Sequence, residues 1–365
     1  MFSIAEDNHR IWSAQRRQRG LCVFTLLMAA ILAGCTPPDS ERSKALSSAL
    51  TVVSYGGGAY QKSHETSFCE PFHLYTGVKV DSITWNAEYG KLKSMVTSGK
   101  VPWDVVEVTA AQFKRGSTDG LFADLSVKPT EGEFLPGSIE DQGVANVYWG
   151  TVLACRKDAF TKGLPRTWAD FFDVQNFPGP RALYDDPRGN LEFALLADGV
   201  ELSGLYPLDV DRAFRKLESI KKDVRVWWKD GTQPVQLLLT HEVVLASAWN
   251  GRIFASQEAK EDIAYSWEGA ALEIDYWVVP RGSANVDLAS RFIAFASSPS
   301  ALAKQAALVG YGPVNVSALD FIPASVRQQL PTFKENWDVS FVVDAEWWAE
   351  NEETTKTRWL AWKMQ

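Results

Sequence analysis

The chain has 365 residues, 46% of them hydrophobic and 12% aromatic, so it can bury more than one core of ordinary domain size. Its 45 acidic and 37 basic residues give a net charge of −8, which disfavours nucleic acid as a partner because phosphate binding needs an excess of lysine and arginine. The four histidines are not spaced as a metal site, so the sequence predicts no bound metal.

The first 34 residues form a predicted export signal. An apolar run at 21–31 follows the arginine-bearing stretch 16–19 and ends in the box Leu32-Ala33-Gly34-Cys35. The run is shorter than the roughly 20 residues of a bilayer span, and its small final residues suit a signal peptidase. The pattern resembles a bacterial lipoprotein signal peptide, with Cys35 as the lipidated N-terminus and 35–48 as a flexible tether; the alternative is an uncleaved anchor. Without the leader, 33 basic and 43 acidic residues remain, a net charge of −10.

The first half of the remaining chain alternates predicted strands and helices. Gly77 should end the first helix, and Pro71 should kink it or mark its late start. This β-α-β-α-β order predicts a mostly parallel sheet covered by helices. The predicted elements are a strand at 50–55, a helix around 68–75, a strand at 78–83, a helix at 89–96 and a strand at 103–108.

The second half continues the same alternation and ends in a long helix rich in tryptophan. Thr167 and Ser298 are predicted N-caps, the second followed by proline in the expected order. We assign the four C-terminal tryptophans to packing on the second half. The predicted elements are strands at 151–155, 182–184 and 243–248, an extended segment at 271–280, and helices from 168 and at 191–197, 233–239, 286–297, from 299 and at 344–362.

Aromatic and carboxylate side chains gather at the predicted strand ends, which is where ligands bind in open α/β sheets. An aromatic ring beside a carboxylate attracts an alkylammonium group by cation–π contact, worth about 0.5–2 kcal/mol, and by a charge-assisted hydrogen bond. Each residue also has a structural explanation, since a strand tryptophan can be core and Asp185-Asp186 can cap a turn. The candidates are Tyr55, Tyr60, Trp85, Thr109, Asp185, Asp186, Trp249, Asp275 and Tyr311.

Catalytic motifs are missing from the sequence. There is no Gly-x-Ser-x-Gly elbow and no phosphate-binding glycine loop, and Gly56-Gly57-Gly58 is either an anion-holding nest or a plain turn. The pairing of His241 with Glu242 does not supply a nucleophile and base. The sequence therefore predicts a protein that is not an enzyme, with a lipid-anchored exported hydrolase as the alternative.

Several short motifs occur in an order that resembles the extracellular solute-binding proteins of ABC importers, in their spermidine/putrescine branch. The likeness covers about 50–362. It implies an α/β, two-lobed periplasmic-binding-protein fold with two hinge crossings, near 145–150 and 273–277, and a C-terminal helical segment. The implied lobes are 49–147 plus 277–320 and 148–276 plus 321–365. The motifs are Tyr148-Trp149-Gly150, Thr167-Trp168-Ala169-Asp170, Asp185-Asp186-x-Arg188, Trp249-Asn250-Gly251, Asp275-x-x-x-x-Pro280 and Gly310-Tyr311-x-Pro313-x-Asn315.

The resemblance also implies roles for the candidate residues. Asp275 matches the central amine-binding carboxylate and Asp186 a second acidic ligand. Trp249 and Tyr311 match aromatic positions, Tyr55 stands where a first-lobe tryptophan is expected, and Thr109 replaces a serine. Gly189, Ala111 and Glu273 depart from the family pattern, so the aromatic box is thinner here. The implied ligand is a small cationic solute such as putrescine or spermidine; the alternatives are a guanidino compound, a sugar, or a zwitterion whose carboxylate meets Arg188.

Partners and location follow from the same resemblance. The chain is expected to be a monomer at the periplasmic face of the cell envelope, held to a membrane by its lipid, and to deliver its solute to an ABC permease with its ATPase. No cofactor is expected, and a surface sensor that feeds a receptor is a further possibility. Cys69 and Cys155 either form one disulfide or remain two separate buried thiols.

Overall fold

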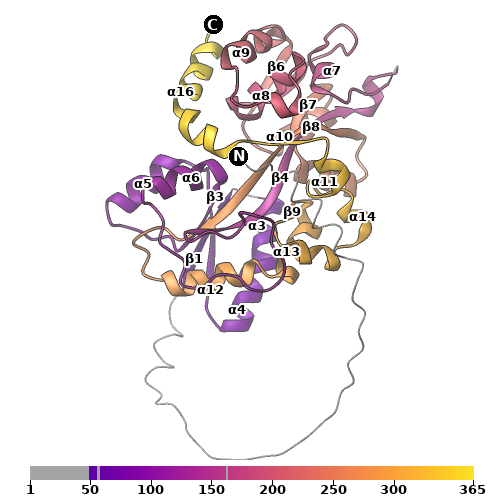
Figure 1. Ribbon diagram of the computed structural model, residues 1–365. Helices are drawn as coiled ribbons and strands as arrows, with labels where there is room; N and C mark the ends of the chain where they lie inside the picture. The colour runs from indigo at the N-terminus through magenta and orange to yellow at the C-terminus, as the bar shows by residue number, and fades with distance from the viewer. Residues whose placement is uncertain (1–48, 56–57, 162) are drawn as a thin grey trace, which may run out of the picture. The chain divides into compact units, whose positions relative to one another are not determined.

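The computed structural model describes residues 49–55, 58–161 and 163–365, so the leader, Cys35, the tether and part of the Gly56–Gly58 turn lie outside the described residues. One sheet passes through the described part in the order β2-β1-β3-β8-β4-β7-β5-β6, with β9 beside β4 and β10 beside β8 (Figure 1). The strands are β1 (Leu50–Tyr55), β2 (Val80–Trp85), β3 (Val105–Thr109), β4 (Gly143–Arg156), β5 (Arg181–Tyr184), β6 (Val224–Trp228), β7 (Leu245–Trp249), β8 (Ile263–Val278), β9 (Gly312–Pro313) and β10 (Phe341–Val342).

The two longest strands, β4 and β8, lie antiparallel in the middle of the sheet (Figure 1). On one side β8 pairs with β3 of a parallel set, and on the other β4 pairs with β7 of a second parallel set. The β4–β8 register shifts between Ala145 and Tyr148 and again between Thr151 and Leu153. The two stretches predicted as crossings, 145–150 and 273–277, therefore pair with each other where the two sets meet.

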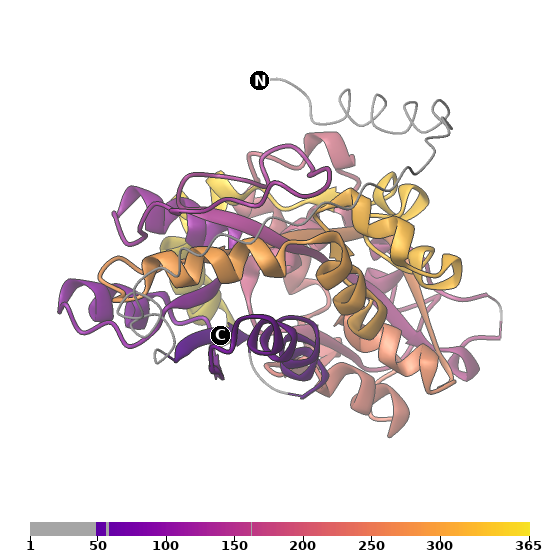
Figure 2. The same ribbon diagram turned by 90° about the horizontal axis from the view of Figure 1, so that it is seen from below.

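The helices that cover the first parallel set bury a continuous apolar core. Gly77, at φ 75°, ends α4 as predicted, and a π-helical turn precedes Pro71, which lacks the N–H that a regular helix would use. Seen from below, the indigo α3–α4 segment lies near the orange α12 (Figure 2). The rings of Phe72 and Phe292, one from each of these segments, are 5.2 Å apart. These elements are α3 (Gly58–His64), η2 (Glu65–Cys69), α4 (Glu70–Thr76), α5 (Tyr89–Thr97), α6 (Ala110–Thr118), α12 (Val286–Ala296) and α13 (Pro299–Val309).

The second parallel set is covered by helices that include the C-terminal one. The yellow α16 lies beside α9 and close to α6 (Figure 1), and its residues Trp348, Trp359 and Trp362 are buried in the core of the second set, as the sequence predicts. The elements are α7 (Trp168–Phe172), α8 (Pro187–Ala197), α9 (Val210–Glu218), α10 (Gln233–Leu239), α11 (Asn250–Glu258), α15 (Lys334–Trp337), α16 (Ala345–Lys363) and the 3₁₀ turns η3 (Lys157–Ala159), η4 (Leu202–Gly204) and η5 (Lys221–Asp223). Helix α14 (Ala324–Arg327) and the 3₁₀ turn η6 (Val316–Phe321) pack on the first core instead.

Several predicted boundaries are wrong, and some elements are not predicted at all. Strand β4 begins eight residues before the predicted 151–155, because pairing with β8 continues through polar positions that break the apolar pattern. Helix α6 is missed although Thr109 and Gln112 form a capping box at its start. Helices α9 and α11 and strand β6 are missed as well.

The two described cysteines are separate thiols. Cys69 and Cys155 are both free and lie in different core clusters, which excludes the predicted alternative of a disulfide between them. Burial raises the pKa of each thiol to about 12. Among the described helices, none combines the length and the apolar character that crossing a membrane requires.

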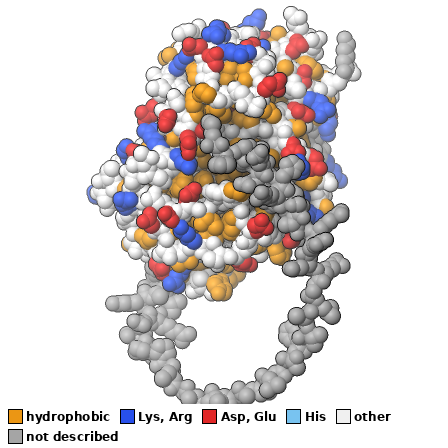
Figure 3. Space-filling view, in the orientation of Figure 1, with side chains coloured by type: hydrophobic (Ala, Val, Ile, Leu, Met, Phe, Trp, Pro, Cys, Tyr) orange, Lys and Arg blue, Asp and Glu red, His pale blue; other side chains and the backbone are white. Residues whose placement is uncertain are grey.

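Charged side chains of both signs are mixed over the face shown in Figure 3. Exposed ion pairs among the described residues include Arg291–Asp287 at 2.9 Å and Arg358–Asp211 at 2.6 Å. Such pairs typically contribute less than about 1 kcal/mol to stability. The visible face thus lacks the excess of basic residues that a nucleic-acid surface needs.

Gly310 is expected to be sensitive to substitution because its backbone is left-handed and the Phe254 side chain occupies the space that a Cβ atom would need. It has a φ of 68°, and an added Cβ would lie 2.6 Å from Cγ of Phe254. Gly99 has the same φ with open space around it and is the matched control. We expect Gly99→Ala to lower the free energy of unfolding by about 1 kcal/mol and Gly310→Ala by about 2 kcal/mol, measured by urea unfolding. Equal losses would show that Phe254 yields to the new methyl group.

Candidate ligand site

Some of the predicted site residues come together because the antiparallel pairing of β8 places them in one row. Thr109 of β3 lies opposite Asp275, and Trp149 of β4 lies opposite Glu273. Residues two apart on a strand share a face, so Glu273 and Asp275 project to the same side of the sheet. Tyr55 ends β1 on the same parallel set as Thr109. The row thus combines two carboxylates with aromatic side chains from both halves of the sheet.

Asp275 is the least satisfied polar group in this row. Its side chain is 2% exposed, and no donor in 49–55, 58–161 or 163–365 forms a hydrogen bond with Oδ1. Burial and the neighbouring Glu107 hold the pKa of the Asp275 carboxyl well above its usual range. The hydroxyl of Tyr55 and the indole Nε1 of Trp149 likewise find no partner in those ranges. Buried polar atoms normally have partners, so this group of atoms is suited to receive a polar ligand.

A second buried carboxylate, Glu107, lies behind Asp275 and is not among the predicted residues. Its Oε1 accepts hydrogen bonds from the Tyr60 hydroxyl at 2.5 Å and from Asn146 Nδ2 at 2.9 Å. His64 Nε2 is 3.9 Å from the same oxygen, but burial lowers the pKa of His64 to about 3, so the imidazole is neutral. An acidic residue between valines on a predicted buried strand is the sequence signal that could have identified it.

The Glu107 carboxyl should make the stability of the ligand-free protein depend on pH. Burial raises its pKa from 4.5 to about 7. The folded state therefore keeps a proton that the unfolded state has already lost, so the stabilisation from this group is full below pH 4.5 and disappears as the pH rises through about 7. We expect the free energy of unfolding of the wild type, measured by urea unfolding relative to Glu107→Gln, to decrease as the pH rises from 4.5 to about 7. Parallel pH profiles would contradict this.

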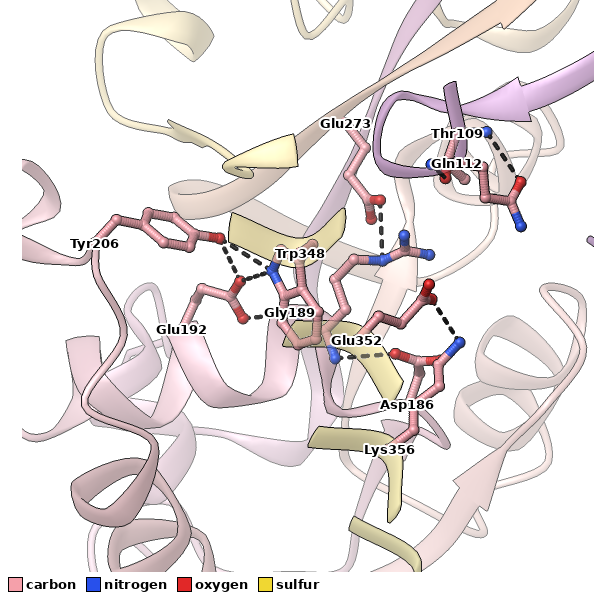
Figure 4. Close-up of polar contacts among 11 residues, drawn as sticks. Thr109, Gln112, Asp186, Gly189, Glu192, Tyr206, Glu273, Trp348, Glu352 and Lys356 are labelled. Carbon is pink, nitrogen blue, oxygen red and sulfur yellow. Dashed lines mark hydrogen bonds and ion pairs between the residues drawn. The ribbon is translucent and has the colours of Figure 1, made fainter. Parts of the chain in front are cut away.

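The other predicted carboxylates, Asp185, Asp186 and Glu273, already have cationic partners. Asp185 pairs with Lys229 and Lys363. Arg188 Nε lies 3.2 Å from Glu273 Oε2, and Lys356 Nζ lies 3.4 Å from Asp186 Oδ2 (Figure 4). Asp186 also accepts a hydrogen bond from the backbone N–H of Arg188 at 3.0 Å. Burial alone would lower the pKa of Arg188, but Glu273 and Asp186 raise it, so the guanidinium is charged. Asp186 and Glu273 thus each have an ion-pair partner, whereas no ion pair to Asp275 forms among the described residues. The roles of Asp186 and Glu273 as ligand-binding residues stay predictions.

The space beside the Arg188–Glu273 pair is nearly closed. The cavity there, lined also by Ala110, Ala111 and Ile274, measures about 10 Å³. One water molecule needs roughly 10–15 Å³ on this measure. The side chains of Arg188 and Glu273 are 14% and 11% exposed. The described residues therefore leave room for about one water molecule beside this ion pair.

The predicted aromatic residues divide into lining and supporting groups. Tyr311 lies 5.4 Å from Tyr60 between ring centroids, in a small apolar cluster on which Tyr55 and Trp149 pack. Trp249 meets Trp149 edge to face at 5.8 Å.

Trp85 and Thr109 support the site instead. Trp85 stacks against Tyr55 at 6.2 Å and donates a hydrogen bond to the Glu107 carbonyl. The Thr109 hydroxyl accepts a hydrogen bond from the Gln112 backbone N–H and so caps α6. The predicted roles of these residues as direct ligands stay predictions.

This fold and site define a ligand-binding protein of the α/β periplasmic-binding-protein class, ending in a C-terminal helix. The profile of the bacterial extracellular solute-binding proteins matches residues 67–338. The chain belongs to this family, whose members bind solutes outside the cytoplasm for ABC importers and are not enzymes.

Two curated relatives from Pseudomonas aeruginosa (strain PAO1) carry named ligands. The gamma-aminobutyric acid-binding protein is 39% identical over 327 residues, covering 88% of this chain and 92% of the relative. The putrescine/cadaverine-binding protein is 23% identical over 184 residues, covering 47% of this chain and 51% of the relative. The likeness to the first is thus both stronger and more complete, whereas the polyamine branch named from the motifs is more distant.

Solved structures match the fold at two levels of similarity. AgtB from Agrobacterium tumefaciens R10, in complex with agropinic acid, is 34% identical with a TM-score of 0.78, covering 87% of this chain and 99% of that chain. AttC from A. tumefaciens C58, in an open unliganded conformation, is 32% identical with a TM-score of 0.65, covering 86% of this chain and 99% of that chain. At similar identity, the liganded structure therefore superposes better.

Proposed function

We propose that this protein captures a small zwitterion with an ammonium group at one end and a carboxylate at the other, and that γ-aminobutyrate is the first compound to test. One observation supports this proposal above all: the charged guanidinium of Arg188 lies near the row of residues that contains Glu273 and the buried Asp275. A linear diamine would place its second ammonium group near this guanidinium, and like charges in a closed site repel. A carboxylate would instead be attracted to it.

The ammonium end would lie against Asp275. The Oδ1 atom without a described donor offers a charge-assisted hydrogen bond, and the rings of Tyr55 and Trp149 offer cation–π contact. A ligand cation there would also offset the repulsion between Asp275 and Glu107.

The carboxylate end would lie against Arg188. Glu273 engages Nε, and the guanidinium has four further N–H donors in the planar geometry that suits a carboxylate. The 39% identical relative is named for a ligand with both of these ends, which supports the same assignment.

Capture would proceed by closure of two lobes about the central strands. The lobes would be 49–147 plus 277–320 and 148–276 plus 321–365, hinged where 145–150 and 273–277 pair in β4 and β8. The nearly filled cavity and the higher TM-score with a liganded structure support a closed conformation here. A ligand that contacts both lobes would favour this form over an open one. Lipidation at Cys35, outside the described residues, would keep the protein at the membrane near its permease.

A thermal-shift screen of the chain without residues 1–35 tests the assignment. Ligands that bind only the folded state raise the melting temperature, and the rise increases with the logarithm of the ligand concentration divided by Kd. We expect γ-aminobutyrate to give the largest rise among γ-aminobutyrate, putrescine, spermidine, agmatine and glucose. If putrescine raises the melting temperature and γ-aminobutyrate does not, the ligand is a polyamine and the proposal of a zwitterion is wrong.

A further inference from the structure

A third buried carboxylate, Glu192 of α8, lies beside Gly189, the residue that follows Arg188 in the chain (Figure 4). Its side chain is fully buried, and each oxygen accepts hydrogen bonds. Oε2 accepts from the backbone N–H of Gly189 at 2.9 Å. Oε1 accepts from the Tyr206 hydroxyl at 2.5 Å and from Trp348 Nε1 at 2.8 Å. Glu192 thus links the Arg188–Gly189 turn, the segment around Tyr206 and the C-terminal helix.

The turn needs such support because its backbone departs from the helix that follows. Arg188 has ψ 132° and Gly189 has φ 84°, a left-handed value that glycine adopts far more easily than other residues. On the other side of Arg188, Asp186 accepts its backbone N–H, and Asn190 Nδ2 donates to the Tyr184 and Asp186 carbonyls. The backbone at Arg188 is therefore fixed from both sides, which fixes the point from which its side chain extends toward Glu273.

Helix α16 supplies a row of side chains to the same turn. Trp348, Glu352 and Lys356 are spaced at i, i+4 and i+8, so they share one face of the helix. Trp348 reaches Glu192, while Lys356 bonds Glu352 at 2.7 Å and pairs with Asp186 (Figure 4). Farther along the helix, Trp362 Nε1 donates to Glu218 at 2.6 Å, a similar bond away from this turn.

We propose that Glu192, supported by Trp348, is a positioning residue for recognition of the ligand's carboxylate. It would act through the Gly189 backbone on the direction of Arg188 and would not touch the ligand. The inference rests on the proposed function, in which Arg188 binds that carboxylate. The C-terminal helix would thereby take part in selecting the solute in addition to packing on the second half.

Glu192→Gln and Trp348→Phe test this inference, with Trp362→Phe as the matched control. Titration calorimetry would compare γ-aminobutyrate with its amide, which keeps the ammonium group and loses the carboxylate charge. In Glu192→Gln an amide N–H₂ must face one of the three donors, so the turn loses support. We expect the preference for γ-aminobutyrate over its amide to fall about tenfold in Glu192→Gln and Trp348→Phe, and to stay within about twofold in Trp362→Phe.

Two results would overturn the inference, and they are distinguishable. If the test variants lose affinity for both ligands equally, or if Trp362→Phe behaves like Trp348→Phe, Glu192 has only a structural role. If the wild-type protein binds γ-aminobutyrate but does not prefer it to the amide, the proposed role of Arg188 fails first. Trp348→Phe removes only one of the three hydrogen-bond donors to Glu192. If Glu192→Gln does not fold, the comparison of Trp348→Phe with Trp362→Phe still tests the inference.

Discussion

Asp275→Asn is expected to weaken solute binding by about 2–5 kcal/mol, because it removes the buried carboxylate partner of the ligand's ammonium group while keeping the side-chain shape. The ligand-free variant should melt no lower than wild type. Burial and the nearby Glu107 raise the pKa of the Asp275 carboxyl, which means that a negative charge at this position is unfavourable without a ligand. A neutral asparagine removes that unfavourable charge.

These opposite effects on binding and stability distinguish a ligand site from a structural one. Titration calorimetry gives the first quantity and thermal unfolding without ligand gives the second. A variant that binds as tightly as wild type would remove Asp275 from the site. A variant with lower stability and proportionally lower affinity would make the residue structural.

Arg188→Met is expected to weaken the binding of a carboxylate-bearing ligand by about 2–5 kcal/mol, because it removes the buried cation that pairs with the carboxylate. It would also leave Glu273 buried without the cation that lies 3.2 Å away. We therefore expect lower stability as well as weaker binding, measured by urea unfolding and calorimetry.

The double variant Arg188→Met/Glu273→Gln separates these two effects. Removing both partners of a buried pair is typically far less destabilising than removing one. We expect the double variant to regain most of the lost stability while binding stays weak. Recovery of binding together with stability would mean that Arg188 only supports the fold. Arg188→Lys should bind at an intermediate level because it keeps the charge and loses the planar donor geometry.

The part of the site that the sequence predicts is the part that depends on local pattern. Strand ends follow from apolar runs and the residues that break them, so Tyr55, Thr109 and Trp249 are found at the ends of β1, β3 and β7. Asp275 follows from the family motif and lies where the antiparallel register brings it opposite Thr109.

The part that the sequence misses depends on contacts between distant segments. Asp186 looks like a free amine ligand until Lys356, 170 residues later, is placed beside it. Glu273 and Arg188 are likewise 85 residues apart. No periodicity indicates such pairs. The sequence predicts the C-terminal tryptophans as packing residues, and three of them are buried in the core. Their indole N–H groups also donate hydrogen bonds to Glu192, Asp185 and Glu218. An apolar pattern does not reveal such bonds.

The continuity of β4 and β8 limits how the two ends of the sheet can move. A hinge made of loops would exchange backbone hydrogen bonds with water on opening, whereas two paired strands can twist as a ribbon and keep theirs. Amide hydrogens near Tyr148 and Ile274, which face each other in this ribbon, should then exchange slowly with and without solute. If the lobes close as proposed, opening would instead break side-chain contacts such as the 2.6 Å ion pair between Arg115 of α6 and Glu353 of α16. Side chains of this kind, and not the backbone of the two strands, would then set the angle at which the two ends of the sheet come to rest.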